Sequence, residues 1–91
     1  MSFPSTTLIA KWEQITTDAI DACEHKVDKL DIAFTLDALE VKADSLFKIL
    51  EISGSEFDIC WFKKKYFKSF KTSFVDEFPG YKFKLIEENK Q

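Results

Sequence analysis

The chain has 91 residues, of which 45% are hydrophobic and 32% are charged, and its formal net charge is −3. This length suits one small domain, and the composition is that of a folded protein rather than a disordered one. No apolar run approaches the roughly 18 residues of a membrane-spanning helix. Two cysteines, Cys23 and Cys60, are too few for a disulfide-stabilised secreted fold. We therefore predict a single domain over residues 1–91 that has no membrane span and is intracellular, in the cytoplasm.

Residues 6–29 have the spacing of an amphipathic helix. With 100° of rotation per residue, Leu8, Trp12 and Ile15 share an arc of about 160° with Val27 and Leu30. Most acidic side chains fall outside this arc, and hydroxyl residues precede it as a helix start would require. The pattern predicts a first helix over about 6–29.

A second apolar arc runs from Ile32 to Leu50 and lies on the opposite side of the first helix's frame. One straight helix would then present two opposite apolar faces, so we expect a break between Leu30 and Thr35, with Thr35 capping a new helix. Helix-favouring residues fill this stretch. The spacing predicts a second helix over about 35–52.

The segment 53–57 interrupts these patterns. Gly54 is suited to a left-handed cap at the end of the second helix. The run Gly-Ser-Glu-Phe is also what two adjacent cloning sites encode, so 53–57 is either a natural turn or an engineered joint.

A third amphipathic segment covers residues 59–78. Phe62, Phe70 and Phe74 share one arc with other aromatic residues, while the lysines project elsewhere. The Pro-Gly pair that follows ends the helix, and residues 81–87 then alternate with the period of two that is typical of a strand.

Two architectures fit these elements. The favoured one is mostly α: three helices (about 6–29, 35–52 and 59–78) followed by a short C-terminal strand at 81–87. A lone strand would leave its backbone groups unpaired. The alternative is therefore an α+β fold with an N-terminal helix, a hairpin at 46–62, a helix at 63–78 and the strand at 81–87.

Basic residues are concentrated near the C-terminus. Residues 1–58 carry 5 Lys and 12 acidic side chains, whereas residues 59–91 carry 8 Lys and 4 acidic side chains. Aromatic residues interleaved with Lys over 61–71 resemble a surface that stacks bases and tracks phosphates. The overall acidity and the absence of Arg argue against nucleic acid. Nucleic-acid binding through 61–71 is therefore the alternative function.

The side chains needed for catalysis or metal binding are sparse. His25 is the single histidine, and with the two cysteines it forms no zinc-ligand spacing. The sequence has no nucleophile motif, phosphate-binding loop or calcium loop. We predict that the protein is not an enzyme and uses no cofactor or metal.

Some apolar side chains fall outside the predicted core arcs. Trp61, Phe57 and Val75 form a second apolar line beside the lysines, and Phe34 forms a similar line with two β-branched residues, Val41 and Ile52. Tryptophan is enriched among binding hot spots. We predict a non-catalytic protein-binding module, such as an adaptor, inhibitor or assembly subunit, whose partner has an acidic or apolar surface. A homodimer is one possible form. The predicted contact residues are Phe57, Trp61, Lys64, Lys65 and Lys68.

Overall fold

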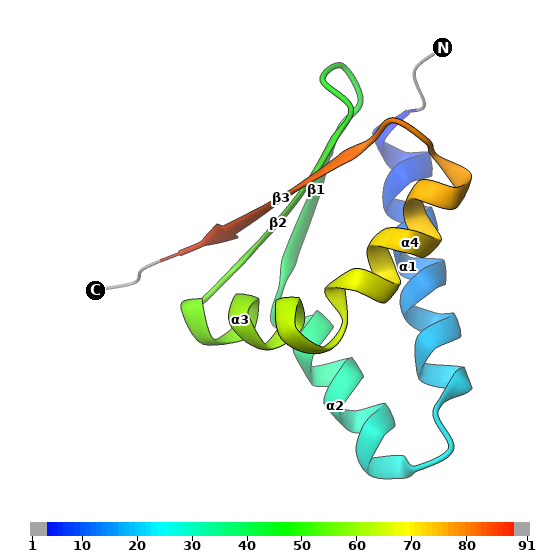
Figure 1. Ribbon diagram of the computed structural model, residues 1–91, viewed down its shortest axis with the longest axis vertical. Helices are drawn as coiled ribbons and strands as arrows, with labels where there is room; N and C mark the ends of the chain where they lie inside the picture. The colour runs from blue at the N-terminus through cyan, green and yellow to red at the C-terminus, as the bar shows by residue number, and fades with distance from the viewer. Residues whose placement is uncertain (1–3, 89–91) are drawn as a thin grey trace.

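The computed structural model describes residues 4–88, which form four helices and a three-stranded sheet. In chain order the elements are α1 (Ser5–Ala22), α2 (Lys26–Asp37), β1 (Glu40–Asp44), β2 (Ile49–Gly54), α3 (Glu56–Lys65), α4 (Phe67–Glu77) and β3 (Lys82–Glu87). Figure 1 shows α1 and α4 side by side, with the long strands twisting past them. The predicted fold class, mostly α or α+β with a C-terminal strand, is confirmed.

The sheet has the strand order β1-β2-β3. β1 and β2 form an antiparallel hairpin in which Ala43 faces Leu50, and β3 lies parallel to β2, so that Leu50 also faces Phe83. A parallel pair needs a crossover connection, which α3 and α4 supply. Leu50 and Ile52 are fully buried, whereas Glu51 between them points to the opposite face. One face of the sheet therefore packs into the core, and the other is mostly polar.

Trp12 on α1 lies at the centre of an aromatic core. Its ring centroid is 5.2 Å from that of Phe70, 6.0 Å from that of Phe62 and 6.3 Å from that of Phe83. Phe62 and Phe74 are fully buried. Truncation of a buried aromatic side chain costs roughly 3–5 kcal/mol. This cluster, which joins α1, α3, α4 and β3, is therefore a main source of the fold's stability.

The first helix is shorter than the spacing predicted. α1 ends at Ala22, and α2 begins at Lys26 after a three-residue connection. The predicted break between Leu30 and Thr35 is wrong, because both residues lie inside α2 and Thr35 is buried there. Neither Gly nor Pro marks the actual turn. The change of direction lets Leu36 of α2 pack against the core that Leu8 and Trp12 of α1 help to form.

The predicted helix over 35–52 is wrong. α2 ends at Asp37, and residues 40–54 form the β1–β2 hairpin. The leucines of this stretch have helical spacing, but Leu46 is 79% exposed in the turn while Leu50 is fully buried in β2. The alternative prediction of a hairpin at 46–62 was closer in kind, but it placed the hairpin too late, because α3 already begins at Glu56.

The predicted helix over 59–78 is two helices. α3 ends at Lys65 and α4 begins at Phe67, with Tyr66 between them at φ −124°. Phe62 and Phe70 still face one core from the two sides of this break, as the shared arc predicted. The predicted strand at 81–87 is confirmed as β3, and its pairing with β2 answers the problem of a lone strand.

Gly54 and Lys48 lie at positions where the local structure restricts the residue type or the backbone conformation. Gly54 is not the left-handed cap that the sequence predicted; it ends β2, where a Cβ atom would lie 2.8 Å from Cδ2 of Leu39. The left-handed non-glycine residue of the described chain is Lys48, with φ 57°, in the β1–β2 turn. There the carboxylate of Asp44 accepts two backbone N–H groups of the turn, at 3.0 and 3.1 Å.

Candidate functional site

The predicted contact residues lie on α3 and at the start of α4. Residues 53–57 span the end of β2, the connecting residue Ser55 and the start of α3. Ser55 caps α3: its Oγ accepts the N–H of Asp58 at 3.2 Å and donates to the carboxylate of Asp58 at 2.8 Å. Three lysines fill the last turn of α3, where positive charge is favourable to the helix dipole. The structure places four predicted residues on α3 and one on α4: Phe57, Trp61, Lys64, Lys65 and Lys68.

Asp31 of α2 connects this region to the rest of the molecule. Its carboxylate accepts the indole N–H of Trp61, with 3.3 Å from Nε1 to each oxygen, and a hydrogen bond from the hydroxyl of Tyr66. The ammonium of Lys65 lies 3.4 Å from the same carboxylate. One carboxylate thus holds α2 against α3 and against the α3–α4 break.

The contacts within this cluster shift the pKa values of Asp31 and Tyr66. The hydrogen bond from Tyr66 is the main cause that lowers the pKa of Asp31; contacts with Trp61 and Lys65 act the same way, and partial burial opposes them. Burial, followed by the contact with Asp31, raises the pKa of Tyr66 well above its usual range. Asp31 therefore accepts these hydrogen bonds as a carboxylate.

Trp61 is half-buried, and its ring contacts the side chains of two neighbouring residues. It stacks on Phe57 with 6.1 Å between centroids and 12° between planes. The ammonium of Lys65 lies 4.6 Å from the centroid of the Trp61 ring. Trp61 and Lys65 are thus held in place by contacts inside the protein, whereas Phe57 is 74% exposed. Val75, which the sequence grouped with Trp61, belongs to α4 and lines a separate hollow with Pro79.

An exposed apolar stripe runs along α2. Val27 is 75% exposed, Leu30 46% and Phe34 71%. Spacings of three and four residues place these side chains on one face of the helix. The sequence pattern predicted that Val27 and Leu30 belong to the buried arc of the first helix. This prediction is wrong, because the chain turns before α2 and both side chains are exposed. Of the predicted line of Phe34 with Val41 and Ile52, only Phe34 is exposed.

The helix that carries this stripe, α2, packs against α3. The residue that follows α2, Ala38, lies beside the end of β2, because a Cβ atom on Gly54 would lie 3.6 Å from the carbonyl oxygen of Ala38. The middle of α2 meets the end of α3, where Asp31 contacts Trp61. Phe34 lies one turn beyond Asp31 on α2 and is exposed. We call five residues of these helices the seam patch: Val27, Leu30, Phe34, Phe57 and Trp61.

Lysines with free ammonium groups lie close to the seam patch. Lys64 and Lys68 are exposed, and neither forms an ion pair within residues 4–88. Lys64 lies one turn after Trp61 on α3, and Lys68 follows on α4. The surface therefore combines an apolar centre with a basic edge, while Lys65 is neutralised by Asp31.

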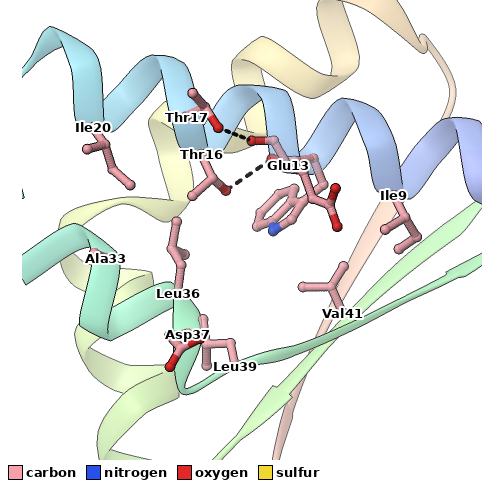
Figure 2. A pocket seen from close by; sticks show the side chains of 11 residues that line it. Ile9, Glu13, Thr16, Thr17, Ile20, Ala33, Leu36, Asp37, Leu39 and Val41 are labelled. Carbon is pink, nitrogen blue, oxygen red and sulfur yellow. Dashed lines mark hydrogen bonds between the residues drawn. The ribbon is translucent and has the colours of Figure 1, made fainter.

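A groove lies on the other flank of α2, between α1, α2 and β1 (Figure 2). Its volume is about 490 Å³. Apolar side chains from all three elements line it, including Ile9, Leu36 and Val41, which point towards one another in Figure 2. Glu13 and Asp37 contribute its charged groups. Local sequence patterns do not reveal this groove, since its walls come from segments whose spacing predicts two helices.

Other reactive groups are dispersed over the described residues. No group of three His, Cys, Asp or Glu side chains in residues 4–88 is arranged to hold a metal ion. Cys23 is half-buried and Cys60 is exposed, and both are free thiols. No helix within this range is both long enough and apolar enough to cross a membrane.

Asp31 is the main site residue that the sequence analysis missed. Its signal was a single carboxylate inside the apolar run Leu30-Asp31-Ile32-Ala33-Phe34. A carboxylate in such a run needs hydrogen-bond donors when it is partly buried, and the donors come from a segment 30 or more residues away. Nothing in the local sequence identifies those donors.

Comparison of the chain with protein-family models, with curated proteins and with solved structures found no match.

Proposed function

We propose that this protein is a non-catalytic protein-binding domain and that the seam patch is its contact surface. The observation that carries the proposal is the joint exposure of Val27 and Phe34 on α2 and of Phe57 on α3, on two helices that Asp31 ties together. Exposed large apolar side chains gathered on neighbouring helices are characteristic of interaction sites.

Burial of this patch would supply binding energy. Removing a Val, Leu or Phe side chain from water is favourable by roughly 1.5–3 kcal/mol each. The aromatic pair is already stacked and Trp61 is already hydrogen-bonded, so little side-chain freedom is lost on binding. Aromatic residues that are held rigidly in this way are typical hot spots.

The basic edge indicates the partner's charge. Lys64 and Lys68 would steer an acidic surface towards the apolar centre and raise the association rate, with an effect that weakens in salt. We infer a partner protein with an apolar centre and an acidic rim. A second copy of this chain is a further possibility that the same experiment tests.

The alternative, nucleic-acid binding through residues 61–71, has less support. Phe62 and Phe70 are buried in the core, and Phe67 packs 5.7 Å from Phe83, so these rings cannot stack on bases. Two lysines of this segment already contact groups of the protein itself: Lys65 is paired with Asp31, and the ammonium of Lys71 lies 5.7 Å from the ring centroid of Phe67.

The test compares two pairs of exposed apolar residues. Phe34→Ser with Phe57→Ser removes the centre of the seam patch, and Leu46→Ser with Phe47→Ser removes a similarly exposed pair at the tip of the β1–β2 hairpin. Light scattering of the purified chain first shows whether it associates with itself. Affinity capture from the source cells then measures how much partner protein each variant binds. We expect the seam variant to lose the partner and the hairpin variant to keep it; the reverse result, or equal capture by both, contradicts the proposal.

A further inference from the structure

The groove between α1, α2 and β1 is separate from the seam patch, because none of the five seam residues lines it. Its volume of about 490 Å³ lies within the range of small-molecule sites, roughly 300–1,000 Å³. Its inner surface is apolar and includes the indole of Trp12, which is only 5% exposed. A ligand therefore needs an apolar body that can rest on Trp12 and the aliphatic side chains around it.

The polar groups around this apolar surface are almost all acceptors. Thr16 donates its hydroxyl proton to the carbonyl oxygen of Trp12 at 3.0 Å, and Thr17 donates to that of Glu13 at 3.1 Å (Figure 2). Both hydroxyl protons are thus committed inside α1, and the two oxygens can only accept. The carboxylates of Glu13 and Asp37 are acceptors as well.

The two carboxylates come from different walls of the groove. Glu13 belongs to α1, and Asp37 ends α2. Neither side chain forms an ion pair or a hydrogen bond within residues 4–88, and both are exposed. None of the residues that line the groove is a lysine, although the chain has 13. The negative charge of the groove is therefore not neutralised from within.

We propose that this groove binds a small hydrophobic amine. The ammonium group would donate hydrogen bonds to one of the two carboxylates, Glu13 or Asp37, which lie apart in Figure 2, and the apolar body would lie against Trp12, Leu36 and Val41. An ammonium carries three donors and no acceptor, which complements the carboxylates and committed hydroxyl oxygens of the groove; the indole N–H of Trp12 is the one remaining side-chain donor among the lining residues. A small hydrated cation could pair with a carboxylate but would leave the apolar inner surface in contact with water. It should therefore bind more weakly than an amine with an apolar body.

The probe is 2-phenylethylamine, titrated into the ¹⁵N-labelled full chain and followed by NMR. We expect shift changes at the indole N–H of Trp12 and at the amides of Thr16, Leu36 and Val41. The neutral analogue 2-phenylethanol should bind more weakly by on the order of tenfold, which is what loss of a charge-assisted hydrogen bond gives. Equal binding of amine and alcohol, or no groove shifts up to the solubility limit of the amine, overturns the proposal.

Charge-matched variants distinguish binding in the groove from attraction of the amine to the overall negative charge of the protein. Glu13→Gln with Asp37→Asn should reduce the affinity for the amine to that for the alcohol. Asp21→Asn with Glu24→Gln removes the same charge from exposed positions outside the groove and should leave the affinity unchanged. All four side chains are exposed, so the variants should retain the wild-type spectrum elsewhere. Equal losses in both double variants overturn the proposal.

Discussion

The carboxylate of Asp31 on α2 accepts a hydrogen bond from the indole N–H of Trp61 on α3, with 3.3 Å between Nε1 and each oxygen, across 30 residues of sequence. Tyr66 and Lys65 donate to the same carboxylate. The inner side of α2 is thus fixed by polar contacts at its middle, while its outward side stays apolar. The position of the seam patch depends on this contact.

Replacement of Asp31 tests that dependence. Asp31→Ala leaves Trp61 and Tyr66 without their acceptor in a partly buried setting, and the loss of such a partner costs about 1–3 kcal/mol. We expect the free energy of unfolding, measured with urea, to fall by that amount. Asp28→Ala, one turn earlier on α2 and exposed, is the control and should change it by less than about 0.5 kcal/mol. Equal effects of the two substitutions would show that the Asp31 contacts do not hold α2.

The Asp31 contact should also make stability depend on pH. The folded state lowers the pKa of Asp31, chiefly through the hydrogen bond from Tyr66. The stabilisation is therefore fully present above the unfolded-state pKa of about 4 and is lost as pH falls through the lower folded-state pKa. We expect the difference in unfolding free energy between wild type and Asp31→Asn to shrink as the pH is lowered from about 6 towards about 3. A difference that stays constant across this range would contradict the assignment.

Truncation of one phenylalanine in the core and one in the seam patch compares how much each contributes to the free energy of unfolding. Phe70 is 2% exposed and packs between Trp12 and Phe62, so Phe70→Ala should cost about 3–5 kcal/mol. Phe57 is 74% exposed, and Phe57→Ala should cost less than about 1 kcal/mol. Urea unfolding of both variants measures the contrast. A small effect of Phe70→Ala would remove α4 from the core, and a large effect of Phe57→Ala would show that the seam patch has a structural role.

The β1–β2 turn offers a stabilising substitution. Lys48 adopts φ 57°, a conformation that costs a non-glycine residue about 1 kcal/mol or more. Lys48→Gly relieves this cost, and the added entropy of the unfolded glycine offsets about 0.5 kcal/mol of it. We expect a net gain of about 0.5 kcal/mol, seen as a small rise in the melting temperature. Lys42→Gly in β1, where the backbone is extended, serves as the opposite control and should lower the melting temperature.

The amphipathic patterns correctly identified which residues form the core of α1, α3 and α4. Leu8, Trp12 and Ile15 are buried, as are Phe62, Phe70 and Phe74, because a helix that must bury one face repeats its apolar residues locally. The strand at the C-terminus was equally evident from its period of two. The predicted contact residues Phe57 and Lys64 are exposed on α3, but their use in binding stays a prediction.

The hairpin and the contacts of Asp31 were decided by tertiary structure. Leucines between residues 36 and 50 fit a helical period, and the strand β2 exists because β3, about 30 residues later, pairs with it through Leu50 and Phe83. The acceptor role of Asp31 likewise depends on donors at Trp61 and Tyr66. Local spacing identified the buried residues of α1, α3 and α4, but not the exposure of Val27, Leu30 and Leu46. Which backbone a segment adopts, and which polar groups meet, depends on partners from distant segments, because backbone and carboxylate hydrogen bonds are completed only when those segments come together.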